Sequence, residues 1–141
     1  MPHLLPTLLL VEDDRADADL TMAAIQDFCN ASEIKLKIEW RRHGEDGLEY
    51  LRSCLRLPKL ILLDLNMPRM NGLEFLEQVR QQAMWRSIPI VVLTTSAHQE
   101  EIETAYGWFC NAYLQKPVDI DHFEALIAAT GQFWLKTAIL P

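Results

Sequence analysis

Positive charge and cysteine are both scarce in this chain. Its 141 residues include 13 Lys and Arg against 20 Asp and Glu, which gives a formal net charge of −7 at pH 7. Nucleic acids and anionic membrane surfaces are bound by clustered cations, so this charge balance argues against both as direct partners. The three cysteines, Cys29, Cys54 and Cys110, form no CxxC pair. We expect reduced thiols rather than a disulfide framework or a cysteine metal site.

Long apolar runs are also missing from the sequence. A membrane-spanning helix needs roughly 20 consecutive apolar residues, and no run in this chain approaches that length. Residues 1–6 lack the basic start of a secretory signal peptide and are interrupted by proline. These features predict a cytoplasmic protein without a membrane partner.

Hydrophobic residues make up half of the chain, which is enough to bury a core. The length suits one domain, and no long linker marks a second. We therefore predict a single domain over residues 1–141, with a lead-in at residues 1–6 and a C-terminal tail at residues 135–141.

Apolar runs and helical periodicities alternate along the chain. Short apolar runs bounded by turn signals are typical of strands buried on both faces, whereas the looser alternation over residues 35–42 favours an edge strand. Five βα units of this kind predict an α/β, doubly wound fold with a parallel sheet covered by helices on both faces. The predicted strands are residues 7–11, 35–42, 60–63, 89–93 and 110–114.

The predicted helices should turn apolar residues toward the core at helical spacing. Leu20 is expected to face inward from the first helix, and Leu55 from the second, which Pro58 is expected to end. Ser96 with Gln99 fits a capping box at the start of the fourth helix.

Acidic and polar side chains follow the predicted strands. Glu12 and Asp13 follow the first strand, Asp64 the third, Thr94 ends the fourth and Lys116 follows the fifth. These strand ends converge on one rim of a doubly wound sheet. Crowded carboxylates repel one another and a hard divalent cation relieves the repulsion, so the three acids predict a Mg²⁺ site. A carboxylate beside Mg²⁺ can attack phosphorus, and a hydroxyl and an ammonium can bind the transferred phosphoryl oxygens.

Each of these residues also has a purely structural interpretation. An acidic pair after a strand is often a helix cap, a threonine at a strand end is often a turn residue, and a lysine before proline is usually solvated. The combination is more specific than any of its members.

Four motifs surround these strand ends, and their spacing is informative. They are Leu9-Leu10-Val11-Glu12-Asp13-Asp14, Ile61-Leu62-Leu63-Asp64-Leu65-Asn66-Met67-Pro68 with Asn71-Gly72, Pro89-Ile90-Val91-Val92-Leu93-Thr94, and Lys116-Pro117. Together they resemble the receiver domains of response regulators in two-component signalling. The resemblance covers essentially the whole chain. It implies a flavodoxin-like receiver fold with strand order 2-1-3-4-5 and no effector domain.

The resemblance also implies a role for each strand-end residue. Asp64 would accept a phosphoryl group from a phosphohistidine on a sensor histidine kinase, and Lys116 would pair with that group. Asp13, Asp64 and the backbone carbonyl of Asn66 would ligate Mg²⁺, for which Mn²⁺ or Ca²⁺ can substitute, and Glu12 would contact the ion mostly through water. The family often has Asp at the Glu12 position, so the longer side chain puts that water-mediated geometry in doubt.

Similar domains carry a conformational switch beside the phosphorylated residue. There Thr94 would move toward the phosphoryl group, and Tyr113 would fill the space it leaves; the alternative is an ordinary half-buried strand aromatic. The resemblance further implies a cis peptide bond at Lys116–Pro117. Asn66 and Ser96 match two positions that tune dephosphorylation in the family.

The region from the fourth helix to the end of the chain is rich in aromatic residues. The chain ends in Phe133-Trp134-Leu135-Lys136-Thr137-Ala138-Ile139-Leu140-Pro141. This ending and the motif Leu93-Thr94-Thr95-Ser96 are similar to those of cyanobacterial phytochrome response regulators. The resemblance implies a phytochrome-type kinase and a homodimer through the helix 4, strand 5 and helix 5 face and the tail. The predicted dimer face consists of Tyr106, Trp108, Phe133, Trp134 and Leu140. The alternative is that most of these side chains belong to the core.

Two further functions stay open at this point. An aspartate-nucleophile phosphohydrolase usually has a second Asp two residues after the nucleophile, where this chain has Asn66. A phosphorylation-independent binding module on the same fold typically lacks one of Asp64, Thr94 and Lys116, and all three are present. The preferred function is a phosphoacceptor signalling domain, with at most self-phosphorylation and self-dephosphorylation as enzymatic activity.

Overall fold

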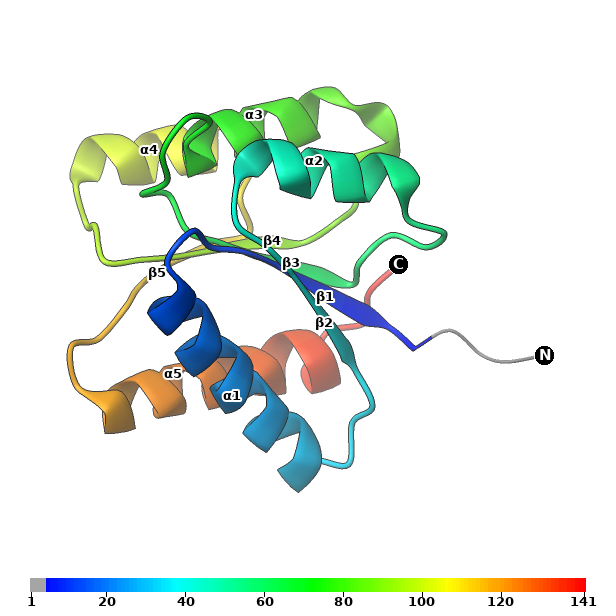
Figure 1. The fold of residues 1–141 in the computed structure, drawn as a ribbon, viewed down its shortest axis with the longest axis vertical. Coiled ribbons are helices and arrows are strands. Elements are labelled where there is room, and N and C mark those ends of the chain that lie inside the picture. The colour runs from blue at the N-terminus through cyan, green and yellow to red at the C-terminus, as the bar shows by residue number, and fades with distance from the viewer. Residues whose placement is uncertain (1–4) are drawn as a thin grey trace.

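Strands and helices alternate along residues 5–141, the part of the chain that the computed structural model describes (Figure 1). Most of the predicted lead-in, residues 1–4, lies outside the described residues. The elements are β1 (Thr7–Val11), α1 (Arg15–Ala31), β2 (Lys37–Arg41), α2 (Gly44–Ser53), β3 (Leu60–Leu63), α3 (Gly72–Gln81), β4 (Ile90–Thr94), α4 (Gln99–Gly107), β5 (Ala112–Gln115) and α5 (Ile120–Gly131). A short 3₁₀ turn (Ala83–Trp85) follows α3, and a π-helical turn (Gln132–Thr137) extends α5. Within residues 5–141, no helix is long and apolar enough to cross a membrane.

The five strands form one parallel sheet in the order β2-β1-β3-β4-β5, which confirms the predicted fold. Every residue of β3 and β4 is buried, as expected for interior strands of a sheet covered on both faces. The edge strand β2 is mostly half-buried, in agreement with its alternating sequence. Parallel pairing brings the carboxyl ends of all five strands to one rim of the molecule.

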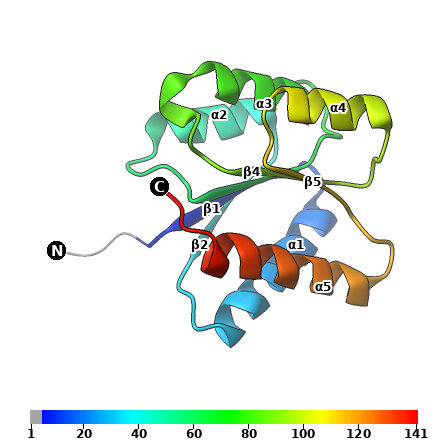
Figure 2. The ribbon, with the colours of Figure 1, turned by 180° about the vertical axis from the view of Figure 1, so that it is seen from behind.

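Helices cover both faces of the sheet in two layers. Figure 1 shows α2, α3 and α4 on one face and α1 and α5 on the other, and the view from behind in Figure 2 gives the same arrangement. Alternate residues of each strand therefore enter different clusters of the core. On β1, Leu9 and Val11 pack in the cluster that contains Phe75 of α3, whereas Leu8 and Leu10 pack in the cluster that contains Phe123 of α5.

Two predicted inward-facing leucines lie outside the core. Leu20 of α1 is 49% exposed, because α1 turns the small residues Ala18 and Thr21 toward the sheet instead. Leu55 is 89% exposed, because α2 ends at Ser53 and the chain is already extended at Cys54, before the expected stop at Pro58.

The start of α4 and the end of the chain also differ from expectation. The N-cap of α4 is His98, which makes no side-chain cap hydrogen bond; the Ser96 hydroxyl instead donates to Glu101 within α4. The tail passes the amino-terminal ends of the strands, where the Lys59 ammonium donates to the Pro141 carbonyl at 2.7 Å. The tail thus lies at the opposite end of the sheet from the acidic rim.

Candidate functional site

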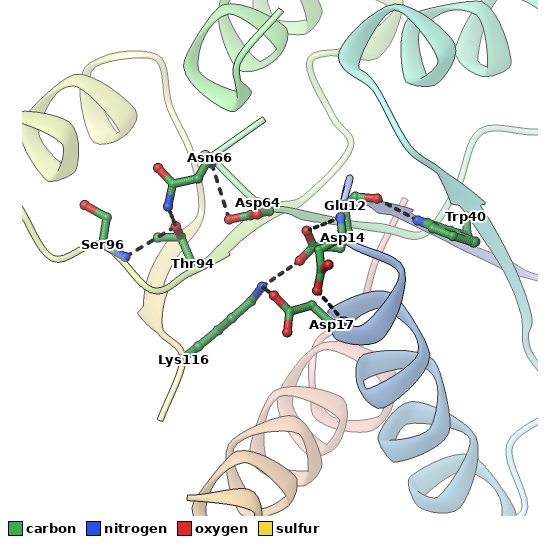
Figure 3. Close-up of polar contacts among 9 residues, drawn as sticks. All are labelled: Glu12, Asp14, Asp17, Trp40, Asp64, Asn66, Thr94, Ser96 and Lys116. Carbon is green, nitrogen blue, oxygen red and sulfur yellow. Dashed lines mark hydrogen bonds and ion pairs between the residues drawn. The ribbon is translucent and has the colours of Figure 1, made fainter. Parts of the chain in front are cut away.

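Asp64 lies directly after β3, at the centre of the rim formed by the carboxyl ends of the strands (Figure 3). Its position is held by a backbone hydrogen bond from Asp64 N to the Val11 carbonyl of β1, at 3.0 Å. The residue is only 6% exposed. The side chain is therefore held at the strand end with little contact with solvent.

The loop after Asp64 is packed so closely that only glycine fits at the start of α3. A Cβ atom on Gly72 would lie 2.4 Å from the Asp64 carbonyl oxygen and 2.6 Å from Leu65 Cα. The Gly72 N–H donates to the Leu65 carbonyl at 3.1 Å, and Asn71 and Glu74 form a capping box for α3. This packing fixes the position of the backbone between Asp64 and the start of α3.

Three carboxylates meet at the rim. Glu12, Asp13 and Asp64 each offer an oxygen, and these atoms lie within 4.8 Å of one another. Oxygen ligands stand about 2.1 Å from Mg²⁺, so opposite ligands are about 4.2 Å apart, and a set of this size fits a small divalent cation. The structure thus brings together the three side chains that the sequence predicts as metal ligands.

Glu12 is the most deeply buried member of this cluster, at 2% exposure. Burial raises its pKa from 4.5 to about 7; the Lys116 hydrogen bond opposes this rise, and the negative charge of Asp64 adds to it. Its backbone carbonyl accepts a 2.7 Å hydrogen bond from the Trp40 indole of β2. Burial therefore disfavours the charged form of the Glu12 side chain.

Lys116 reaches the cluster from the end of β5. Its ammonium lies 2.6 Å from Glu12 Oε1 and 3.7 Å from Asp17 Oδ2, and these are its ion pairs within residues 5–141 (Figure 3). Burial alone would lower the pKa of Lys116, but the Glu12 hydrogen bond and the charge of Asp64 outweigh it, and the net pKa is raised. The peptide bond between Lys116 and Pro117 is trans, so the predicted cis bond is wrong.

A chain of hydrogen bonds leads from the acidic cluster toward α4. The Asn66 side-chain amide donates to the Thr94 hydroxyl at 3.2 Å, and Ser96 N approaches the same oxygen at 3.5 Å. The Tyr113 hydroxyl donates to the Ser96 carbonyl at 3.0 Å, and burial raises the pKa of this phenol. Tyr113 N donates to the Tyr106 hydroxyl of α4 at 3.1 Å. The residues predicted as the switch and its neighbours are therefore linked.

The five residues predicted as a dimer face lie on α4 and the turn after it, on the π-helical turn and in the tail. Trp108 packs against the core cluster under α2 and α3, whereas Trp134 packs against the cluster under α1 and α5, on the other side of the sheet. Leu140 lines a hollow at the amino-terminal end of the sheet. Tyr106 and Phe133 are the most exposed of the five, at 48% and 51%, and the other three are partly buried.

Sequence reasoning missed two contacts of this site. Trp40 is 28 residues from Glu12, and nothing in the alternating pattern of β2 marks its indole as a hydrogen-bond donor to the rim. Asp17 lies in the first turn of α1, and nothing in the surrounding sequence marks it as a second acid near Lys116.

Comparison with known proteins identifies the family. A family model described as the response regulator receiver domain matches residues 8–128. This chain is a member of the response regulator receiver domain family. The receiver domain is thereby related to signalling proteins rather than to conventional enzymes.

The receiver domain is similar to characterised relatives over nearly its whole length. Response regulator Rcp1 of Synechocystis sp. is 33% identical over 139 residues, which cover 95% of this chain and 92% of Rcp1. A probable methanogenesis regulatory protein, FilR2 of Methanothrix harundinacea, is 36% identical over 132 residues, which cover 91% of this chain and 83% of FilR2.

Solved structures support the same assignment. The phosphorylated cyanobacterial phytochrome response regulator RcpA matches with a TM-score of 0.90 at 31% identity, over 98% of this chain and 99% of RcpA. The Mn²⁺-bound form of Rcp1 matches with a TM-score of 0.86 at 33% identity, over 96% of this chain and 99% of Rcp1. The predicted similarity to cyanobacterial phytochrome response regulators is confirmed.

Proposed function

We propose that this receiver domain accepts a phosphoryl group on Asp64 from a phosphohistidine of a sensor histidine kinase. The observation that carries the proposal is the position of Asp64, nearly buried at the end of β3 and within 4.8 Å of two other carboxylates. In the transfer, a carboxylate oxygen of Asp64 forms a bond to phosphorus, and the bond between phosphorus and the donor imidazole nitrogen breaks. A weakly solvated, fixed carboxylate suits this role because little solvent must be rearranged for the attack.

The residues that would hold the metal are Glu12, Asp13, Asp64 and the backbone carbonyl of Asn66. A bound Mg²⁺ would offset the charge of the phosphoryl oxygens as they approach the carboxylates. The Mn²⁺-bound Rcp1 structure supports a divalent cation in a related protein. Lys116 and the Thr94 hydroxyl supply a cation and a hydrogen-bond donor for the same oxygens.

Incubation with acetyl phosphate and Mg²⁺, followed by intact-mass measurement, tests the phosphorylation site. The wild-type protein should gain one phosphoryl group, and Asp64→Asn should gain none, because an amide is not a nucleophile toward phosphorus. Asp14→Asn is the matched control: Asp14 is exposed, caps α1 through Asp17 N, and keeps that cap as Asn. A phosphoryl group that persists in Asp64→Asn refutes the assignment.

The output is proposed to pass along the chain of hydrogen bonds from Asn66 to α4. If the Thr94 hydroxyl turns to a phosphoryl group on Asp64, it leaves Asn66 and the Ser96 N–H, and Tyr113 is free to repack. This is a shift between two arrangements, since each contact is broken or made as a unit. Nuclear magnetic resonance of the Tyr113 ring should show a change on phosphorylation in the wild type and none in Thr94→Ala.

The kinase is proposed to be a phytochrome-type photoreceptor, because RcpA is a phytochrome response regulator. Phosphotransfer profiling against the histidine kinases of the source organism tests this, and preference for a kinase without a chromophore domain would contradict it.

Homodimerisation is proposed to use the exposed aromatic residues Tyr106 and Phe133 rather than all five residues of the predicted face.

A further inference from the structure

The end of β2 contacts the turn that carries the first two acids of the rim. The Trp40 indole donates to the Glu12 carbonyl at 2.7 Å, and the Arg42 guanidinium donates to the Asp13 carbonyl at 3.1 Å. Between these contacts, the Glu12 N–H donates to the Arg41 carbonyl at 3.0 Å. Three consecutive residues at the end of β2 therefore hold the backbone of the acidic turn. We call the side chains of Trp40 and Arg42 the β2 brace.

The two side chains of the β2 brace also contact each other. The guanidinium carbon of Arg42 lies 5.6 Å from the centre of the Trp40 ring, within the range of a cation–π contact. Residues two apart in an extended chain point to the same face, so these two side chains lie together. Arg41 lies on the other face, over the ring of Tyr50 of α2. The alternation of the strand thus separates the brace from its neighbour.

The brace fixes the acidic turn without using a carboxylate oxygen, because both of its hydrogen bonds end on backbone carbonyls. Figure 3 shows Trp40 approaching Glu12 from the side opposite Lys116. The carboxylate oxygens of the rim lie within 4.8 Å of one another, and ionised carboxylates at this distance repel one another. A turn that is held by its backbone resists this repulsion and keeps its shape.

We propose that the β2 brace positions Glu12 and Asp13 for a small cation, and so sets the preference of the rim for Mg²⁺ over Ca²⁺. Mg²⁺ requires nearly octahedral oxygen ligands at about 2.1 Å, whereas Ca²⁺ accepts irregular sets at about 2.3–2.6 Å. Without the brace the turn yields to the repulsion between the acids, which weakens the binding of Mg²⁺ more than that of Ca²⁺. The inference rests on the metal site of the proposed function and not on phosphoryl transfer to Asp64.

Calorimetric dissociation constants for Mg²⁺ and Ca²⁺, measured without a phosphoryl donor, test the Trp40 contact. Trp40→Phe keeps an aromatic ring and removes the indole N–H, and should weaken Mg²⁺ binding about tenfold and Ca²⁺ binding by less than about threefold. Trp134→Phe is the matched control, because Trp134 packs against the same core cluster but lines a hollow at the amino-terminal end of the sheet. An equal factor for the two cations in Trp40→Phe overturns the proposal.

Arg42→Met separates position from charge. Arg42 is a cation beside a cation site, so loss of its charge alone would tighten the binding of both divalent ions by the same factor. Loss of its hydrogen bond to Asp13 should instead reduce the preference for Mg²⁺ over Ca²⁺ severalfold. The ratio of the two dissociation constants is therefore the decisive quantity, and a ratio equal to that of the wild type overturns the proposal.

Nuclear magnetic resonance of the metal-free wild type keeps the test valid even if a variant fails to fold. In EDTA the Trp40 indole proton should exchange slowly with water, because its hydrogen bond to Glu12 is present before any cation binds. Rapid exchange of this proton in EDTA overturns the proposal, as does a wild type that binds no Mg²⁺. Failure of Asp64 to take up a phosphoryl group would leave all three results unchanged, so it is distinguishable from failure of the brace.

Discussion

Buried Glu12 should make the metal-free receiver domain less stable as the pH rises through neutrality. Its folded-state pKa is raised from 4.5 to about 7, chiefly by burial, so between these values the folded protein binds a proton that the unfolded chain releases. The stabilising contribution is then complete below about pH 4.5 and is lost as the pH rises through about 7. At about 1.4 kcal/mol for each pH unit, this interval corresponds to about 3 kcal/mol of unfolding free energy.

Urea unfolding in EDTA across this range, followed by circular dichroism, measures the effect. The free energy of unfolding of the wild type should fall by about 3 kcal/mol more between pH 4.5 and pH 8 than that of Glu12→Gln, which cannot titrate. Glu39→Gln is the control of opposite sign, because its hydrogen bond to Lys37 lowers the pKa of Glu39 and its stabilising effect is lost toward acid pH. Parallel pH profiles for the wild type and Glu12→Gln would refute the reasoning.

Three more outcomes follow from the packing. Gly72→Ala should lower the unfolding free energy by about 2 kcal/mol or more, because its Cβ would lie 2.4 Å from the Asp64 carbonyl oxygen. The same clash should slow phosphorylation by acetyl phosphate. A urea midpoint and a phosphorylation rate equal to those of the wild type would contradict this. Phe75→Ala, at a fully buried site, should cost about 3–5 kcal/mol in the same assay, while Leu55→Ala at an 89% exposed site should stay within about 0.5 kcal/mol. Phe133→Ala should weaken self-association in sedimentation equilibrium, and an unchanged dissociation constant would exclude this residue from the interface.

The strands and the rim could be predicted because their signals are local. Each buried strand is a continuous apolar run, and a polar residue at its end marks where the chain leaves the sheet. Parallel topology then requires these ends to meet, so the sequence alone predicts that Glu12, Asp13 and Asp64 lie together.

The rotation of helices and the pairing of charges could not be predicted in the same way. The apolar periodicity of α1 predicts that Leu20 faces the core. In the structure the smaller residues Ala18 and Thr21 face the sheet instead, because they allow the helix to pack closer to it. The Lys116 ammonium pairs with Glu12, which is 104 residues away in the sequence. This pairing depends on the length of the lysine side chain and on the burial of both groups, and sequence spacing does not indicate it. Arg80 is only 8% exposed, and its guanidinium donates to backbone carbonyl groups such as that of Phe109. No sequence motif predicts this role.

The sheet also acts as a partition between two halves of the hydrophobic interior. Leu8 and Leu10 face one helical layer and Leu9 and Val11 the other, so side chains of the two clusters are separated by backbone. Substitutions in opposite clusters should therefore have additive effects on stability. In evolutionary terms, the α1 and α5 layer can accept new residues without compensating changes beneath α4, and the two outer surfaces are free to diverge toward different partners at different rates.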